Sequence, residues 1–305
     1  MSELIKRVLV AIIGIPLAIL LIYFGGLFFT VAIISISSIG LYEFYIICKS
    51  KNFESEMILG IIFGAIIQIL YFYFIQKEDL LSTFLSQFIA FIILMIILMI
   101  VALKRGVLGG IARISTTLTG IMYISMFFLS LIGIRSLFNI EKALQTSLVA
   151  FSYHVRAANY VYGLDDRGCG FMVLSIFIGI WICDTAAYFI GRRFGKHKIY
   201  PDISPKKSWE GGIAGLIAGG TAFVLSVRLF NPEFPFLDSL FIGMIVGITG
   251  QIGDFAESLL KRDANLKDSS NIIPGHGGIL DRFDSILFVS PLVYIYLLLL
   301  VMFGK

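Results

Sequence analysis

The sequence has few charged residues: Asp, Glu, Lys and Arg make up 14% of its 305 residues, against roughly 25% in an ordinary soluble domain. Hydrophobic residues make up 58%, and the mean hydropathy is +0.94. A soluble fold has no room to bury that much apolar surface, so lipid must solvate part of it. The composition therefore predicts an all-α integral membrane protein that crosses a lipid bilayer several times.

The sequence also lacks a large excess of charge and any pattern of paired cysteines. A formal net charge of only +4 does not suggest nucleic-acid binding, because that needs a concentrated basic face. The three cysteines are Cys48, Cys169 and Cys183, and their spacing indicates neither a disulfide framework nor a zinc site. Cys48 and Cys183 fall in apolar runs, so we interpret them as small buried hydrophobic residues.

No small-residue cleavage site follows the first apolar run. Met1–Arg7 and the apolar residues 8–24 have the basic-then-apolar pattern of a signal peptide, but further apolar runs come directly after them. We therefore expect this segment to be retained as the first helix.

Nine apolar runs are long enough to cross a bilayer, which needs about 20 mostly apolar residues. They lie near residues 8–24, 27–47, 57–75, 81–103, 116–138, 171–190, 212–230, 235–253 and 285–303. Gly25-Gly26 predicts a tight turn between the first two. Lys and Arg gather near the N-terminus and in the even-numbered connections. By the positive-inside rule these parts are cytoplasmic, and we expect the protein in the plasma or inner membrane.

We divide the chain into three parts. Residues 1–138 form an N-terminal membrane region of about five spans, and residues 139–170 form a non-cytoplasmic connecting segment. Residues 171–305 form a second membrane region of about four spans, with two cytoplasmic motif loops at 192–211 and 254–284. In the connecting segment, apolar residues recur at near-helical spacing (Ile140, Leu144, Leu148, Phe151), which favours a short interfacial helix.

Glycines recur every four residues in two of the later spans. Gly211, Gly215 and Gly219 lie on one predicted helix, and Gly243 and Gly247 on the next. Small residues at this spacing let transmembrane helices approach closely. The pattern fits packing within the chain or a homodimer contact, and we favour packing within the chain.

The two motif loops hold much of the charge. Residues 192–210 carry eight of the 44 charged side chains, and residues 254–284 carry ten. If the eighth helix continues past residue 253, Asp254, Glu257, Ser258 and Lys261 share one of its faces. Asp281 and Asp284 begin the ninth helix, after a Gly-rich turn whose backbone N–H groups suit phosphate oxygens.

Each of these groups has two interpretations. The carboxylates suit Mg²⁺, which often binds through one or two carboxylates plus substrate phosphates, or they form a salt-bridged cap between helices. Asp184 lies inside a predicted span, where an ionisable residue is a functional candidate or a structural hydrogen-bond acceptor. Ser204-Pro205 followed by Lys206 and Lys207 suits a phosphate-gripping turn, or it is the positive-inside signal itself.

The second loop resembles the signature of the phosphatidate cytidylyltransferase family, also called CDP-diacylglycerol synthases. Eleven identities within about 27 residues match, namely Ser258, Lys261, Arg262, Lys267, Asp268, His276, Gly277, Gly278, Asp281, Arg282 and Asp284. Ser204–Gly211 resembles a second family element, with Ser208 where Thr is usual. The resemblance covers most of residues 170–305. Residues 1–138 match mainly in hydropathy, and the connection at 139–170 is longer than the family usually has.

The resemblance implies that CTP and phosphatidic acid give CDP-diacylglycerol and pyrophosphate at the bilayer surface, in phospholipid biosynthesis. It implies Mg²⁺ as the cofactor and leaves a second cation open. The implied metal ligands are Asp281 and Asp284, with Asp254 and Asp184 as further ligands. Lys267, Asp281 and Asp284 are the implied catalytic residues. The implied substrate-binding residues are Ser204, Lys206, Lys207, Ser258, Lys261, Arg262, His276 and Arg282. We expect His276 to shape the Gly-rich turn and not to transfer protons.

Three other functions are weighed against this one. CDP-alcohol phosphotransferases have an Asp-Gly-x-x-Ala-Arg opening and a four-residue Asp spacing, which are absent here. A CTP-dependent polyprenol kinase is closer in architecture. A secondary transporter would have two similar halves and polar groups at mid-membrane, whereas this sequence has no internal repeat and gathers its charges at one face. A cytidylyltransferase is therefore the favoured prediction.

Overall fold

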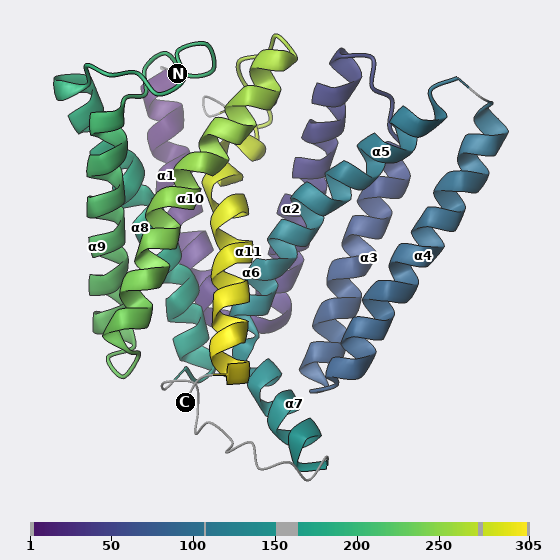
Figure 1. Cartoon of the computed structure of the whole chain (residues 1–305), viewed down its shortest axis with the longest axis horizontal. Helices are drawn as coiled ribbons and strands as arrows, with labels where there is room; N and C mark the ends of the chain where they lie inside the picture. The colour runs from purple at the N-terminus through teal and green to yellow at the C-terminus, as the bar shows by residue number, and fades with distance from the viewer. Residues whose placement is uncertain (1–2, 107, 151–163, 274–276, 304–305) are drawn as a thin grey trace.

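The computed structural model describes residues 3–106, 108–150, 164–273 and 277–303, which are almost entirely helical. The helices are α1 (Glu3–Phe24), α2 (Gly26–Ser50), α3 (Met57–Gln76), α4 (Leu80–Arg105), α5 (Gly110–Gly120), the π-helical turn η1 (Ile121–Ser125), α6 (Met126–Arg135), α7 (Leu137–Ala150), α8 (Asp166–Phe194), α9 (Trp209–Phe230), α10 (Phe236–Asp263) and α11 (Leu280–Phe303). The N-terminus lies at the upper end of the bundle and the C-terminus at the lower end (Figure 1).

The predicted all-α membrane fold is confirmed. Within the described residues, eight helical segments are long and apolar enough to cross a membrane, and α5, η1 and α6 together form one of them. The predicted span at 8–24 coincides with α1, whose described apolar stretch, Ile12–Phe24, is shorter than the others. Its crossing of the membrane therefore stays a prediction. Helix α10 continues to Asp263, beyond the end expected at residue 253.

A short helix, α7, is present in the connecting segment, as predicted. It packs at the lower end of the bundle, where Leu137 and Ile140 are buried. Its placement at a membrane interface stays a prediction, as does the three-part division of the chain. Residues 151–163 lie outside the described residues, and Phe151 of the predicted pattern is among them.

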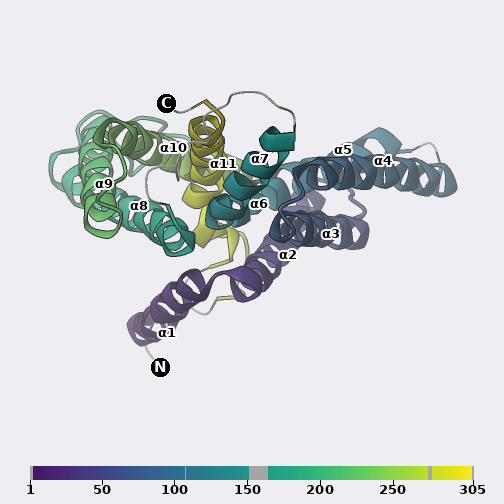
Figure 2. The same cartoon turned by 90° about the horizontal axis from the view of Figure 1, so that it is seen from below.

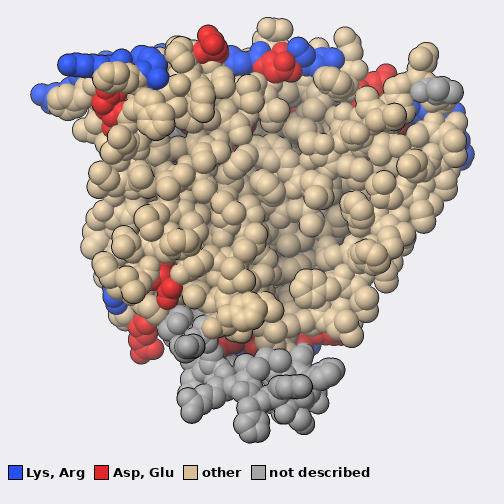
Figure 3. Space-filling model, viewed as in Figure 1, with Lys and Arg blue, Asp and Glu red and all other residues tan. Residues whose placement is uncertain are grey.

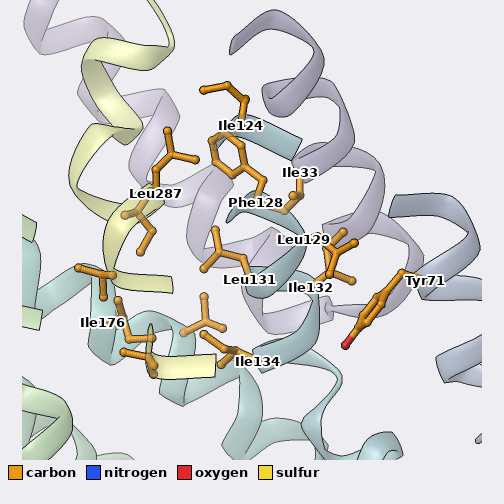
Figure 4. Close-up of a cluster of buried hydrophobic side chains, with 14 of the residues drawn as sticks. Ile33, Tyr71, Ile124, Phe128, Leu129, Leu131, Ile132, Ile134, Ile176 and Leu287 are labelled. Atoms are coloured by element: carbon orange, nitrogen blue, oxygen red, sulfur yellow. The ribbon is translucent and has the colours of Figure 1, made fainter. Parts of the chain in front are cut away.

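Helix α6 is the centre of the fold. Every residue from Phe128 to Arg135 is buried. Its side chains lie among Ile33 of α2, Ile176 of α8 and Leu287 of α11 (Figure 4). A helix that is buried all round belongs in the interior of a bundle. Seen from below, α6 and α11 lie between the group of α8, α9 and α10 and the group of α3, α4 and α5 (Figure 2).

The glycines of α9 and α10 lie at helix contacts within the chain. A Cβ atom at Gly219 of α9 would lie 2.6 Å from Cys183 Cβ of α8, and one at Gly215 would lie 2.9 Å from the Cys183 carbonyl oxygen. A Cβ atom at Gly243 of α10 would lie 2.9 Å from the carbonyl oxygen of Gly220. The prediction of close packing within the chain is therefore confirmed.

The turn between α1 and α2 is held by Arg135 at the end of α6. Gly25 has a φ of +60°, and a Cβ atom there would lie 2.0 Å from the Arg135 guanidinium. The guanidinium is buried, donates a 3.0 Å hydrogen bond to the Ile22 carbonyl oxygen, and pairs with Asp166 of α8 at 2.7 Å. One side chain thus ties α1, α6 and α8 together at the lower end.

Candidate active site

A cavity of about 920 Å³ opens between α8, α9, α10 and α11, where α8 and α10 end and α9 and α11 begin. Lys and Arg side chains gather along this upper edge of the molecule (Figure 3). The cavity is lined by eight of the predicted site residues, namely Asp184, Ser204, Lys206, Lys207, Asp254, Asp281, Arg282 and Asp284. Folding therefore brings most of the predicted site together from two separate stretches of sequence.

Three carboxylates reach the cavity from three different helices: Asp184 from α8, Asp254 from α10 and Asp284 from α11. Asp284 lies within electrostatic reach of the other two. Helices α10 and α11 approach closely here, because a Cβ atom at Gly253 would lie only 2.4 Å from the Asp284 carbonyl oxygen. This glycine places Asp254 beside Asp284. We call Asp184, Asp254 and Asp284 the carboxylate cluster.

Another part of the cavity lining comes from the loop between α8 and α9, residues 195–208, which we call the lysine loop. Its turn is closed by hydrogen bonds from Ser204 N to Tyr200 O at 2.9 Å and from Lys207 N to Ser204 O at 3.2 Å. The Lys207 ammonium forms an ion pair with Asp254 and lies 4.2 Å from the centre of the Phe255 ring. The loop therefore holds a cation in direct contact with the carboxylate cluster.

The lysine loop is anchored where α9 begins. The Ser208 hydroxyl accepts a 3.3 Å hydrogen bond from Gly211 N and so acts as the N-cap of α9, a position that Ser and Thr both fill well. Glu210 accepts a 3.2 Å hydrogen bond from His197 N and lies 2.7 Å from His197 Nδ1. Serine in place of the family's usual threonine therefore keeps the cap.

Asp281 also lines the cavity, but its carboxylate is already fully engaged. One oxygen contacts Lys261 Nζ at 2.5 Å, and the other accepts hydrogen bonds from Ser269 N at 2.9 Å and Gly278 N at 2.8 Å. Lys261 also pairs with Glu257, which is buried. These contacts fit the salt-bridged cap, one of the two interpretations that the sequence left open. Asp281 therefore belongs both to this network and to the cavity lining, and its predicted roles as a metal ligand and a catalytic residue stay predictions.

Five of the predicted site residues are not among the residues that line the cavity. The Ser258 hydroxyl donates to Asp254 Oδ1 at 3.4 Å, and Lys261 belongs to the buried cap. Arg262 is exposed and donates to Leu266 O at 2.9 Å, while Lys267 is exposed outside the cavity. His276 lies outside the described residues. The substrate contacts predicted for the first three and for His276 stay predictions, as does the catalytic role predicted for Lys267.

The sequence interpretation missed Glu43 and Gln251. Gln251 lines the cavity and donates from Nε2 to the Gly247 and Gly212 carbonyl oxygens at 2.7 and 3.1 Å. Glu43 is fully buried in α2 and contacts the segment before α11. A signal for Glu43 was present, because it is an acidic residue inside a predicted span, the same criterion that identified Asp184.

Comparison with known proteins shows the family to which the chain is related. The model of the cytidylyltransferase family matches residues 5–300. A phosphatidate cytidylyltransferase of Synechocystis is 30% identical over 97% of both chains. The enzyme of that name from Bacillus subtilis is 42% identical, and the one from Staphylococcus haemolyticus is 46% identical. These two matches cover 50% and 46% of this chain, and the chain spans only 54% and 53% of the two relatives' lengths.

Proposed function

This chain belongs to the cytidylyltransferase family, and we propose that it transfers the cytidylyl group of CTP to phosphatidic acid, forming CDP-diacylglycerol and pyrophosphate. One observation carries the proposal: carboxylates of α8, α10 and α11 and the cations of the lysine loop line a single cavity. The cavity lies at one end of a bundle of apolar helices. A water-soluble nucleotide and a phosphate held in the bilayer can meet there.

The chemistry of this reaction matches the residue types in the cavity. The attacking group is an oxygen of the phosphatidate phosphate, whose second pKa near 6 leaves it largely ionised at neutral pH. It forms a bond to the α-phosphorus of CTP while the bond to the bridging oxygen of pyrophosphate breaks. No side chain has to remove a proton, but two polyanions must approach each other. Catalysis then requires positioning and neutralisation of charge.

The cations of the cavity supply part of that neutralisation. Lys206, Lys207 and Arg282 line it, and Arg192 and Lys198 join them. We assign these five residues to the phosphate oxygens of CTP and of the lipid. Lys207 pairs with Asp254 in this structure, so binding of a phosphate draws its ammonium away from the carboxylate.

The carboxylate cluster fits Mg²⁺. Its donors are all carboxylate oxygens, which this ion prefers, and Mg²⁺ is usually bound by one or two carboxylates plus substrate phosphates. Within the described residues, no three His, Cys, Asp or Glu side chains lie close enough to enclose a metal ion by themselves, which fits an ion whose remaining ligands come from the substrate. We assign the ion to Asp254 and Asp284 together with substrate phosphates. Ligation by Asp184 and by Asp281, which also line the cavity, stays a prediction. When bound, Mg²⁺ neutralises charge on the phosphates.

Pyrophosphate release by the purified protein tests this function. We expect release only when CTP, phosphatidic acid and Mg²⁺ are all present, and none when any one of them is omitted. CTP labelled at the α-phosphorus should leave its label in the lipid, whereas CTP labelled at the γ-phosphorus should not. Transfer of the γ-label to a lipid would instead identify a kinase and contradict the proposal.

A further inference from the structure

Glu43 of α2 has a fully buried carboxylate that contacts the polar segment leading into α11. The Ser270 hydroxyl donates to one of its oxygens at 2.5 Å, and the Ser269 hydroxyl lies 3.0 Å from the other. The backbone N–H groups of Ile279 and Leu280 donate to it at 2.9 and 2.8 Å. Three donors and the Ser269 hydroxyl thus converge on a single side chain that lies more than two hundred residues earlier in the chain.

These contacts replace an N-cap that the local sequence does not provide. Leu280 is the first residue of α11, and the preceding Ile279 has no side-chain oxygen to accept from the free N–H groups of the first turn. A carboxylate at this end of a helix is also favoured by the helix dipole. Glu43 therefore stabilises the start of α11 from a neighbouring helix.

The backbone in front of α11 lies directly against Glu43. A Cβ atom at Gly278 would lie 2.5 Å from one Glu43 carboxylate oxygen and 2.0 Å from the Ser269 hydroxyl. Gly277 has a φ of +80°, a conformation that favours glycine. The two glycines thus allow the turn to lie against Glu43 and leave it little room to shift.

Ser269 connects Glu43 to the cavity. Its hydroxyl lies 3.0 Å from Glu43 Oε2 and 2.9 Å from Asp281 Oδ2, and its backbone N–H donates to the same Asp281 oxygen. Asp281 lies in the first turn of α11, next to Arg282 and close to Asp284, and all three residues line the cavity. The position of this part of the cavity therefore depends on a side chain of the N-terminal region.

From this geometry we infer that Glu43 is a positioning residue for the reaction. It acts through the backbone of residues 269–280 and sets the place of Arg282 and Asp284 relative to the lysine loop. The inference rests on the proposed function for its kinetic consequence, but its structural consequence is independent of that function. It also gives residues 1–138, where the sequence shows mainly apolar spans, a part in forming the site.

The test compares Glu43→Gln with Glu56→Gln. Glu56 is also a largely buried carboxylate, but it pairs with Arg105 and Arg113, away from the cavity. Hydrogen–deuterium exchange of the purified, substrate-free proteins is measured over residues 269–283. We expect exchange at Ile279 and Leu280 to become roughly 10- to 100-fold faster in Glu43→Gln, since charge-assisted hydrogen bonds are lost. Glu56→Gln should exchange like the wild type there.

Kinetics provide the second readout. We expect kcat for cytidylyl transfer to fall roughly 10- to 100-fold in Glu43→Gln. The KM for CTP should change by a smaller factor, because Arg282 is the one cation of the five that lies in the affected turn, and the other four keep their places. Ser270→Ala removes one donor to the same carboxylate and should shift both readouts in the same direction by a smaller factor. It replaces Glu43→Gln if that variant does not fold.

Unchanged exchange and unchanged kcat in both Glu43→Gln and Ser270→Ala would overturn the inference. Equal exchange of residues 269–283 in Glu43→Gln and Glu56→Gln would overturn it as well. If the wild-type protein transfers no cytidylyl group, the proposed function fails instead. The exchange comparison then still decides whether Glu43 holds the turn.

Discussion

At the scale of single residues, the acidic side chains around the cavity have two distinct environments. Asp254 and Asp284 line the cavity. Among the described residues, Asp254 forms one ion pair, with Lys207, and Asp284 forms none. Asp281 lies three residues before Asp284, yet its oxygens are engaged by Lys261, Ser269 and Gly278. Substitutions should therefore separate activity from stability.

Asp254→Asn and Asp284→Asn should each lower kcat at least about 100-fold, because each removes a charge that the reaction needs in place. The loss is measured as labelled CDP-diacylglycerol formed by the purified variants at saturating Mg²⁺. Asp238→Asn is the matched control, since Asp238 lies at the other end of α10 and accepts a 2.6 Å hydrogen bond from Tyr296. Wild-type turnover by either cavity variant would refute the assignment of the carboxylate cluster.

Asp281→Asn should lower stability by about 3 kcal/mol, because it leaves the buried Lys261 and Glu257 without one partner of their network. Thermal unfolding in detergent measures this change. Asp254→Asn serves as the comparison and should unfold close to the wild type, since its carboxyl is about one-third exposed. If Asp281→Asn instead unfolds like the wild type, Asp281 does not act as a structural cap.

At the scale of helices, α8 and α9 lie close together because their contact surface consists of small residues. Without this approach, the lysine loop that joins them would not lie above Asp184. This contact between α8 and α9 also explains why the spacing of glycines by four in the sequence indicated close helix packing. It marks the pair of helices that supports one side of the cavity.

Gly219→Ala should destabilise the protein by about 1–3 kcal/mol, because the added methyl group would lie 2.6 Å from Cys183 Cβ and cannot be accommodated without a shift. The change appears as a lower unfolding temperature of the purified protein. Gly14→Ala in α1 is the control, since no atom lies within 4 Å of its added Cβ. Equal unfolding temperatures for the two variants would show that the α8–α9 contact is looser than described.

At the scale of the whole molecule, Lys and Arg gather at the end of the bundle that holds the cavity (Figure 3). By the positive-inside rule we propose that this end faces the cytoplasm, where CTP is made available to the enzyme. The lower end, with the turn between α9 and α10, would then face outward.

Labelling of single cysteines tests this orientation. In a Cys48→Ala background, a membrane-impermeant maleimide added to intact cells should label Glu233→Cys at the lower end. It should label Lys104→Cys at the upper end only after the cells are permeabilised. Both positions are exposed in the structure, and the remaining native cysteines, Cys169 and Cys183, are buried. The reverse pattern would show that the cavity opens outward.

The sequence by itself determined the approximate positions of the eight long apolar helices of the described residues, because the length of an apolar run is a local property that the bilayer selects directly. The ninth expected span, at α1, stays a prediction. It also located the two motif loops and most residues that line the cavity, since their charges stand out against apolar surroundings. It did not predict the π-helical turn η1 inside the span expected at 116–138. The carbonyl oxygen of Ser125 in that turn accepts a hydrogen bond from Gln68 of α3, a contact with no local signal.

Only the tertiary structure decided which of the carboxylates that line the cavity is also engaged in the cap. Asp281 and Asp284 look equivalent in the sequence, and their difference arises from Lys261 and Ser269, which fold against one of them and not the other. The hydrogen bonds between Glu43 and the start of α11 likewise join distant parts of the chain. Local spacing specifies helices and their faces, whereas the partner of a buried charge is chosen by the packing of helices that are far apart in sequence.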